Sequence, residues 1–209
     1  MTIRWMLVVL LVVACGFCWA SAGGLPNHLS GASSQYLKRA ERQPVDWYPW
    51  SAAAFAEARR RDVPVLLDVG AVWCPWCSLM DRESYTNVET AAYINVNFIA
   101  VKVDFDQDPR LSAKLQRAQA LLNLPAGLPL TAFVTPEGKL YSGGAYFPPE
   151  ARGGKPAFRK ALADARQKFR QQRSEIGRDG LDLNLSEEFH AQQGRSFHRT
   201  HGSAETLGR

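Results

Sequence analysis

The chain has 209 residues, of which 46% are hydrophobic and 22% are charged, with a formal net charge of +5. That length is enough for one domain with a real core plus a tail. Residues 23–151 carry 12 Lys and Arg against 13 Asp and Glu, whereas residues 152–209 carry 12 against 7. We interpret this C-terminal basic excess as a solvated helix and tail. Because no pattern of surface aromatic residues accompanies it, nucleic-acid binding is not supported.

Residues 1–22 have the anatomy of a secretory signal peptide. Arg4 supplies the positive charge, residues 5–14 are almost purely apolar, and residues 20–22 are small, as cleavage positions require. Two alternatives stay open: a lipobox that places lipid on Cys15, or retention of residues 5–22 as a membrane anchor. All three put the rest of the chain outside the cytoplasm, so we expect a periplasmic or secreted protein.

Helix and strand signals alternate along the rest of the chain, which indicates an α/β domain. Residues 23–50 are interpreted as an N-terminal extension, residues 51–176 as the domain, and residues 177–209 as a disordered polar tail, because few large apolar residues occur there. Cap and turn residues, together with hydrophobic periodicity, place the individual elements. The expected helices span residues 51–61, 74–84, 87–97, 108–122 and 156 onward, and the expected strands span 63–69, 98–104, 131–134 and 139–142.

Cys74 and Cys77 are the only cysteines beyond the leader. A bridge between them closes a short loop, which constrains the unfolded chain least, so it indicates a redox centre rather than a structural disulfide. The strand before Cys74 should run into a helix that begins there, and a helix N-terminus favours a thiolate. We therefore expect an exposed Cys74 to attack substrate and Cys77, further inside, to resolve the intermediate. Pro75 suits the first helical turn.

Metal binding by these cysteines is an alternative to a redox role. Zinc needs four ligands, and the chain has no second cysteine pair to complete such a site. Cu(I) is a better candidate, because Cys74, Cys77 and Met80 would offer three soft ligands at positions i, i+3 and i+6. A Cu(I) carrier therefore stays open, although Met80 at this spacing is more often a core residue. The redox interpretation itself requires no metal and no cofactor.

An interaction module is a further alternative, because several aromatic residues lie close to prolines and could line a groove. Packing of the N-terminal extension onto the domain is the simpler interpretation. The residues concerned are Trp47, Tyr48, Trp50, Tyr146 and Phe147.

Asp68 interrupts the apolar run of residues 65–69, where a charge is costly to bury. Its carboxylate could reach solvent or find a local hydrogen bond. The functional interpretation is a buried acid beneath the dithiol, with a pKa raised by desolvation. Such an acid could exchange a proton with Cys77 through one water molecule.

The stretch from Asp68 to Cys77 resembles thioredoxin, which has a buried Asp six residues before its first active cysteine and a Trp directly before it. Asp68, Trp73, Cys74 and Cys77 match that motif one by one. The resemblance implies a thioredoxin fold, a central mixed β-sheet flanked by helices. It also implies a cis-proline facing the dithiol, matched here by Pro129. Leu128, Pro129 and Trp73 are therefore the expected substrate-binding residues.

Four further blocks resemble the N-terminal thioredoxin-like domain of the spermatogenesis-associated thioredoxin-domain family: residues 44–50, 81–85, 101–104 and 143–150. This resemblance covers about residues 27–173. The chain departs from that family at Pro75 and Ser78, where the family usually has His. The long helical C-terminal domain of the family has no counterpart in this sequence, so we expect the thioredoxin-like domain to stand alone.

Together these features predict an extracytoplasmic thiol–disulfide oxidoreductase whose partners are protein thiols and disulfides. Asp68 and Trp73 favour a reductant, although Pro75 directly after the first cysteine is also seen in disulfide oxidants. A reductant in that compartment would need an electron donor, for which a membrane protein is the expected source. The sequence does not indicate an oligomeric state.

Overall fold

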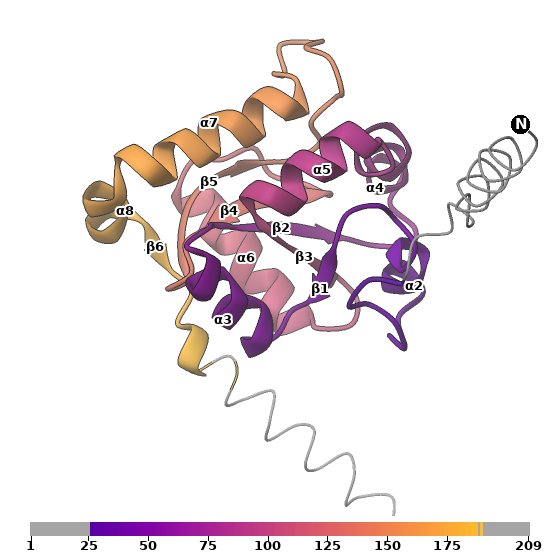
Figure 1. The fold of residues 1–209 in the computed structure, drawn as a ribbon, viewed down its shortest axis with the longest axis horizontal. Coiled ribbons are helices and arrows are strands. Elements are labelled where there is room, and N and C mark those ends of the chain that lie inside the picture. The colour runs from indigo at the N-terminus through magenta and orange to yellow at the C-terminus, as the bar shows by residue number, and fades with distance from the viewer. Residues whose placement is uncertain (1–25, 188, 190–209) are drawn as a thin grey trace, which may run out of the picture.

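The computed structural model describes residues 26–187 and 189, and within them the chain forms a six-stranded mixed sheet (Figure 1). The strand order is β1-β3-β2-β4-β5-β6. The first three strands in this order are parallel to one another, and the remaining three continue the sheet in antiparallel fashion. The strands are β1 (Trp47–Pro49), β2 (Val65–Gly70), β3 (Ile99–Asp104), β4 (Leu130–Val134), β5 (Lys139–Gly144) and β6 (Leu181–Asp182).

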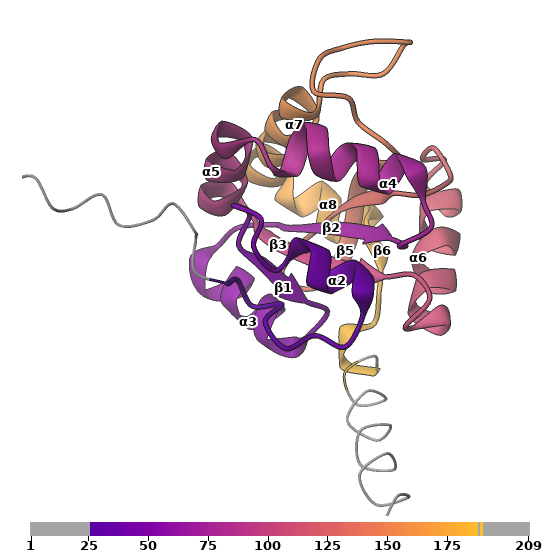
Figure 2. The ribbon, with the colours of Figure 1, turned by 90° about the vertical axis from the view of Figure 1, so that its right-hand side faces the viewer.

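Helices cover both faces of this sheet, which confirms the predicted α/β thioredoxin fold class (Figures 1 and 2). Helices α2, α4, α5 and α7 pack on the first face, and α3 and α6 pack on the second. The helices are α2 (Gln35–Ala40), α3 (Ala52–Arg61), α4 (Pro75–Met80), α5 (Val88–Asn97), α6 (Pro109–Leu121), α7 (Phe158–Gln171) and α8 (Arg173–Asp179), and a π-helical turn η1 (Asp81–Tyr85) follows α4.

Strand β2 is buried along its whole length, between two separate apolar cores. Because side chains alternate along a strand, Leu66 and Asp68 face the first core, while Val65, Leu67 and Val69 face the second. In the sheet register, Asp68 is paired with a residue of β3 on one side and a residue of β4 on the other. These neighbours are Lys102 and Thr131.

The predicted helix caps are confirmed. Ser51, Asn87 and Asp108 each accept a hydrogen bond from a backbone N–H in the first turn of the helix that follows. The predicted hairpin of β4 and β5 also forms, and Gly138 in its turn has a φ of 92°. Two of the helices differ from the prediction. The helix predicted over residues 74–84 is split into α4 and η1, and α7 begins at Phe158 rather than at residue 156.

The segment 27–49, interpreted from sequence as an extension outside the domain, contributes to the same fold. Its strand β1 pairs with β3 at the sheet edge, so a domain boundary at residue 51 divides the sheet. Trp47 and Trp50 are buried, and so are Tyr146 and Phe147, which follow β5. These four aromatic residues are core residues, and the groove that they were considered to line is not formed by them.

Residues 177–185 are ordered, and the prediction that the tail is disordered from residue 177 onward is wrong for them. Strand β6 pairs with β5, and Leu183 and Leu185 are buried in the second core. Strand β6 ends at Asp182, and leucines 181, 183 and 185 pack against the second core from an otherwise polar sequence, a pattern that composition alone does not reveal. Residues 190–209 lie outside the described residues.

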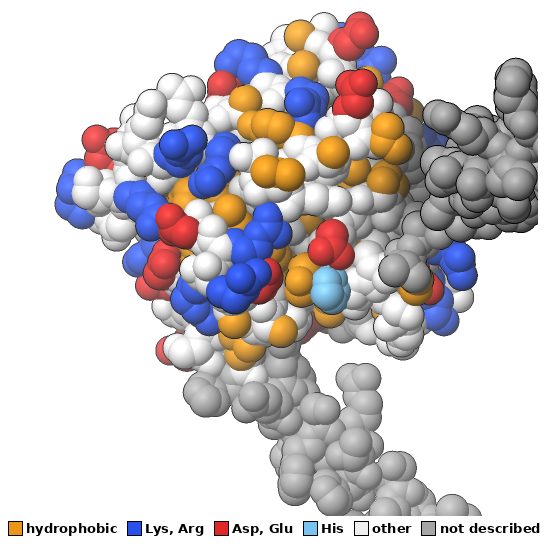
Figure 3. All heavy atoms as spheres, in the orientation of Figure 1, with side chains coloured by type: hydrophobic (Ala, Val, Ile, Leu, Met, Phe, Trp, Pro, Cys, Tyr) orange, Lys and Arg blue, Asp and Glu red, His pale blue; other side chains and the backbone are white. Residues whose placement is uncertain are grey.

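The predicted leader, residues 1–22, also lies outside the described residues. Among those that are described, no helix has the length and apolar character needed to cross a membrane. Basic side chains gather on one part of the surface, where helix α7, helix α8 and the end of α3 meet (Figure 3). Arg61, Arg166, Arg170 and Arg173 line this region, in keeping with a solvated basic helix.

Candidate redox site

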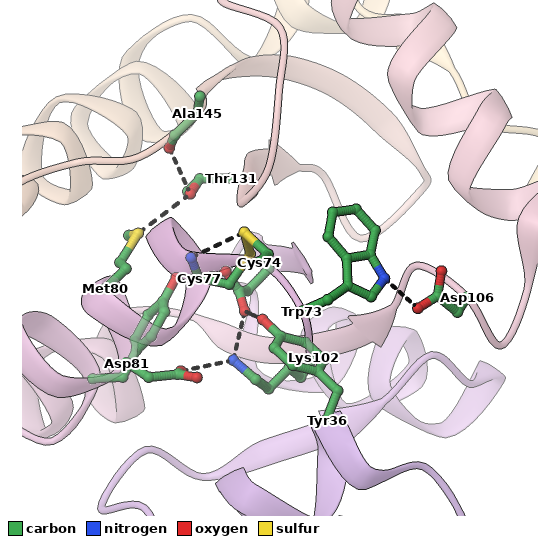
Figure 4. Close-up of a disulfide and its surroundings, with 12 residues drawn as sticks. Tyr36, Trp73, Cys74, Cys77, Met80, Asp81, Lys102, Asp106, Thr131 and Ala145 are labelled. Carbon is green, nitrogen blue, oxygen red and sulfur yellow. Dashed lines mark hydrogen bonds and ion pairs between the residues drawn. A yellow bond between two sulfur atoms is a disulfide. The ribbon is translucent and has the colours of Figure 1, made fainter. Parts of the chain in front are cut away.

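Cys74 and Cys77 form a disulfide at the N-terminus of α4, with their Cα atoms 5.3 Å apart (Figure 4). Cys74 is the N-cap residue, and its Sγ accepts a hydrogen bond from the backbone N–H of Cys77 at 3.1 Å. Pro75 occupies the first turn, where a missing N–H leaves no helical partner unsatisfied. The sulfur of Cys74 therefore lies where helix N–H groups favour a negative charge.

The exposed side chains at the site are tryptophans, whereas the cysteines are buried. Cys74 and Cys77 are only 3% and 1% exposed, so the expectation of an exposed Cys74 is wrong for the disulfide form. Trp73 and Trp76 flank them and are 60% and 54% exposed. The indole of Trp73 donates to Asp106 Oδ2 at 2.7 Å (Figure 4), whereas Trp76 stands against another ring. The surface around the disulfide is consequently formed by two indoles.

Leu128 and Pro129 lie at the same end of the central strands as the cysteines. The peptide bond between them is cis. Strand β4 begins at Leu130, which pairs with Val69 near the C-terminal end of β2, because the two strands are antiparallel. The chain leaves β2 at this same end to reach Cys74. Pro129 is buried and Leu128 is partly buried against the core that contains both cysteines. The structure thus brings the two predicted substrate-binding positions to the cysteine end of the sheet.

Asp68 is 1% exposed and carries three partners. Its Oδ2 accepts hydrogen bonds from Lys102 Nζ at 2.6 Å and from the Tyr36 hydroxyl at 2.8 Å, while its Oδ1 accepts one from the Tyr85 hydroxyl at 3.3 Å. The predicted burial of Asp68 is confirmed. Lys102, which the sequence analysis did not foresee at this position, offsets the cost of burying the Asp68 charge.

Lys102 is completely buried between two carboxylates. Its Nζ lies 2.6 Å from Asp68 and 3.0 Å from Asp81, and it stands over the rings of Tyr36 and Trp47 at 4.5 and 4.7 Å from their centroids. Burial alone lowers the pKa of Lys102, but the two carboxylates outweigh it, so the pKa is raised. The ammonium therefore stays charged.

Both tyrosines at Asp68 serve as hydrogen-bond donors. Burial, followed by the charges of Asp68 and Asp81, raises the pKa of Tyr36 and of Tyr85 well above the ordinary value of 10.0. Their hydroxyls keep their protons at physiological pH and present them to the carboxylate. The site beneath the disulfide is thus a satisfied polar network inside an apolar core.

Four residues of this site were not predicted from the sequence: Lys102, Tyr36, Tyr85 and Asp81. Lys102 carried a usable signal, because it interrupts an apolar strand just as Asp68 does, and two such strands side by side would pair their charges. Tyr36 carried none, since it lies on α2, 32 residues before Asp68 in the sequence.

Met80, the third ligand considered for Cu(I), is a core residue. Its side chain is fully buried, and the Thr131 hydroxyl lies 4.0 Å from its Sδ (Figure 4). Within the part of the chain that the structure describes, no group of three or more His, Cys, Asp or Glu side chains could hold a metal ion.

Comparison with known proteins identifies relatives over most of the chain. Residues 26–185 match the family model Thioredox_DsbH, described as "Protein of unknown function, DUF255". Spermatogenesis-associated protein 20 of Homo sapiens is 34% identical over 152 residues, which are 73% of this chain and 19% of the human protein. An uncharacterized protein of Caenorhabditis elegans is 32% identical over 157 residues, 75% of this chain and 22% of that protein. The chain thus spans about a fifth of the length of these relatives.

Similar solved structures include a DsbH oxidoreductase, at 23% identity and a TM-score of 0.45, covering 59% of this chain and 85% of that one. Another is a thioredoxin from Thermus thermophilus, at 21% identity and a TM-score of 0.39, covering 59% of this chain and 86% of that one. The predicted resemblance to the spermatogenesis-associated proteins is confirmed, and the chain belongs to the Thioredox_DsbH family, as a thioredoxin-like domain with a bonded Cys74–Cys77 pair.

Proposed function

We propose that this protein is a thiol–disulfide oxidoreductase that acts on protein disulfides outside the cytoplasm, as a reductant. The observation that carries the proposal is the Cys74–Cys77 disulfide at the N-terminus of α4, with two exposed indoles beside it. A disulfide that closes so short a loop does little for stability, and a sulfur at a helix N-terminus is suited to ionise and attack.

In the proposed reaction the reduced protein meets a substrate disulfide. The Cys74 thiolate attacks one substrate sulfur, a mixed disulfide forms, and the first substrate thiolate leaves. Cys77 then loses its proton and attacks the sulfur of Cys74. This forms the Cys74–Cys77 disulfide and releases the second substrate thiolate, so two electrons have passed to the substrate. A dithiol donor, for which we propose a membrane protein, must return two electrons to the cysteines.

The surroundings of the cysteines support binding of an extended substrate segment. We propose that Trp73 contacts the substrate, because it is exposed and its indole is held by Asp106. Leu128 and Pro129 lie at the same end of the central strands, and the Leu128 backbone there could pair with a strand of the substrate. The extracytoplasmic location is proposed from the leader sequence, and the reductant direction from the Asp68 and Trp73 motif.

The assignment of roles is tested by trapping. Cys77→Ser should accumulate covalent adducts with substrate proteins, because the attack that resolves the mixed disulfide is lost. Cys74→Ser, the matched control, should trap none. Non-reducing gel electrophoresis with mass spectrometry measures both. Equal trapping by the two variants, or none by either, would contradict the assigned roles.

The direction of electron flow is tested by the reduction potential of the Cys74–Cys77 pair, measured by alkylation and mass shift across glutathione and dithiothreitol buffers. A value near about −270 mV supports a reductant, whereas one near about −120 mV would make the protein an oxidant. A pair that never cycles would refute the oxidoreductase proposal altogether. Insulin reduction by the purified protein provides an independent activity measurement.

A further inference from the structure

The Tyr36 hydroxyl lies at the junction between the buried carboxylate and the disulfide. It donates to Asp68 Oδ2 at 2.8 Å, and the ring is 3% exposed. Gly70, at the end of β2, marks the junction: a Cβ atom at this residue would stand 2.9 Å from Cys77 Sγ and closer still to the Tyr36 hydroxyl. The oxygen and the sulfur therefore border the same point in space, and a glycine is needed there for both to approach.

The other groups around Asp68 lie elsewhere. Lys102 joins Asp68 to Asp81, and Tyr85 reaches the second carboxylate oxygen, Oδ1. Neither Lys102 nor Tyr85 is among the three atoms nearest to the Gly70 position, which belong to Tyr36 and Cys77. Among the hydrogen-bond donors to Asp68, the Tyr36 hydroxyl is therefore the one that lies nearest to the Gly70 position together with the Cys77 sulfur.

Helix α2, which carries Tyr36, is fixed to the rest of the site. Its N-cap Ser34 donates a hydrogen bond to Asp104 at the end of β3, and Asn27 donates to the carbonyl oxygen of Ala40 at 2.8 Å. Lys102 Nζ stands 4.5 Å from the centroid of the Tyr36 ring, so the network also holds the ring. The hydroxyl is therefore held in place by the fold and not by a chance rotamer.

We propose that Tyr36 relays the proton between Cys77 and Asp68 when Cys77 resolves the mixed disulfide, an inference that rests on the proposed function. The Tyr36 oxygen takes the proton of the Cys77 thiol while its own proton passes to Asp68. Cys77 becomes a thiolate, Asp68 becomes neutral, and Tyr36 is chemically unchanged. Asp68, paired with Lys102, then loses this proton to solvent and returns to the carboxylate found in the disulfide form. When the donor reduces the disulfide again, Asp68 takes up a proton from solvent and passes it by the reverse path to the Cys77 thiolate.

The two proton movements occur together. Burial, followed by the Asp68 and Asp81 charges, raises the pKa of Tyr36 well above 10.0, so the hydroxyl does not ionise on its own. Lys102 remains in place through the cycle and stabilises the carboxylate when it is charged. The relay therefore places the N-terminal segment, and not only the Cys-Pro-Trp-Cys motif, inside the reaction.

The test separates the two chemical steps. Reduced protein is mixed with 5,5′-dithiobis(2-nitrobenzoate) in a stopped-flow instrument, where Cys74 attack releases one thionitrobenzoate and Cys77 attack releases a second. Tyr36→Phe keeps the ring over Lys102 and removes only the hydroxyl. We expect the first phase within about 2-fold of wild type and the second slowed about 10-fold or more near neutral pH. The deficit should shrink at alkaline pH, where Cys77 loses its proton to solvent.

Tyr85→Phe is the matched control, because it removes the other hydroxyl from the same carboxylate. We expect its second phase to slow less than that of Tyr36→Phe, because Tyr85 stabilises the Asp68 charge but is not among the atoms nearest to the Gly70 position beside Cys77. Equal slowing of the second phase in both variants would overturn the relay, since it would mean that the hydroxyls act only by stabilising the Asp68 charge. An unchanged second phase in Tyr36→Phe would overturn it as well.

A measurement on the wild-type protein keeps the proposal testable even if Tyr36→Phe fails to fold. On the pH plateau of the second phase, transfer of two protons together predicts a slower release in deuterium oxide, and equal rates in the two solvents would refute the relay. Failure of the proposed function looks different, because the wild-type protein would then show no second release at all.

Discussion

The two faces of the β-sheet are formed by the same strands but differ in the polarity of their buried side chains. The face under α3 and α6 is lined by apolar side chains, among them Leu67 and Val101. The face under α2, α4, α5 and α7 has a large apolar core too, but Asp68 and Lys102 point into it from neighbouring strands. The face under α2, α4, α5 and α7 therefore carries the buried charges and the disulfide. The face under α3 and α6 supplies uninterrupted hydrophobic burial.

The position of the buried charges supports the proposed location of the function in the fold. Burying an ion pair is costly, and apolar residues of the same volume would often serve stability as well or better. The charges occur only one strand position away from leucine and valine residues that face the other core. Their presence beneath Cys77, with donors on both oxygens of Asp68, is best understood through the chemistry of the disulfide.

The largest expected loss of stability follows from removing the positive charge of Lys102. Lys102→Met keeps an unbranched stem but leaves Asp68 and Asp81 without their ammonium partner. We expect a loss of about 3–5 kcal/mol in the free energy of unfolding, because uncompensated carboxylates remain buried. Urea unfolding at neutral pH with the disulfide intact measures it.

The double variant Asp68→Asn/Lys102→Met provides the control for this loss. It removes the charge on Asp68 together with that on Lys102, so it should recover part of the lost stability. A double variant less stable than Lys102→Met by the full cost of a second independent substitution would contradict the pairing.

A substitution on the second face, under α3 and α6, tests whether that face contributes to stability alone. Leu67→Ala leaves a cavity in a fully buried strand and should cost about 3 kcal/mol, within the range for buried leucines. The rate of each thiol–disulfide step, measured by the same two-phase release, should not change. A selective slowing of the second phase in this variant would show that the two faces are not functionally separate.

The most gradual expected effect is the response to alkaline pH. The pKa values of Tyr36, Tyr85 and Lys102 are raised above 10.0, 10.0 and 10.5 by the folded structure. Groups of this kind stabilise the fold fully below their unfolded pKa, and the contribution is lost as pH rises through the folded pKa. Stability should therefore fall above about pH 10, by about 1.4 kcal/mol per pH unit for each group that is deprotonated only in the unfolded chain.

Urea midpoints from about pH 8 to about pH 11 test this response. Tyr36→Phe and Tyr85→Phe should each make the decline shallower, because each removes one of the groups that titrate. Leu67→Ala should lower the whole curve without changing its slope. A wild-type curve that stays flat across this range would contradict the raised pKa values.

Much of the fold and the motif at its centre could be predicted from the sequence. Ser51, Asn87 and Asp108 marked helix starts because capping is a local interaction between a side chain and the next turn. The strands followed from short apolar runs, and the cysteine pair from its spacing and its position after a strand. Burial of Asp68 was also predictable, because an acid within an apolar strand has few other places to go.

Tertiary structure alone decided what surrounds Asp68. Sheet order β1-β3-β2-β4 sets Lys102 beside it, and α2 brings Tyr36 from a segment that sequence analysis left outside the domain. Likewise, Leu183 and Leu185 became core residues only because β6 pairs with β5. Local sequence determines caps, turns and periodicity through contacts a few residues apart. Contacts between distant segments depend on the arrangement of the whole chain, and the partners of a buried charge are such contacts.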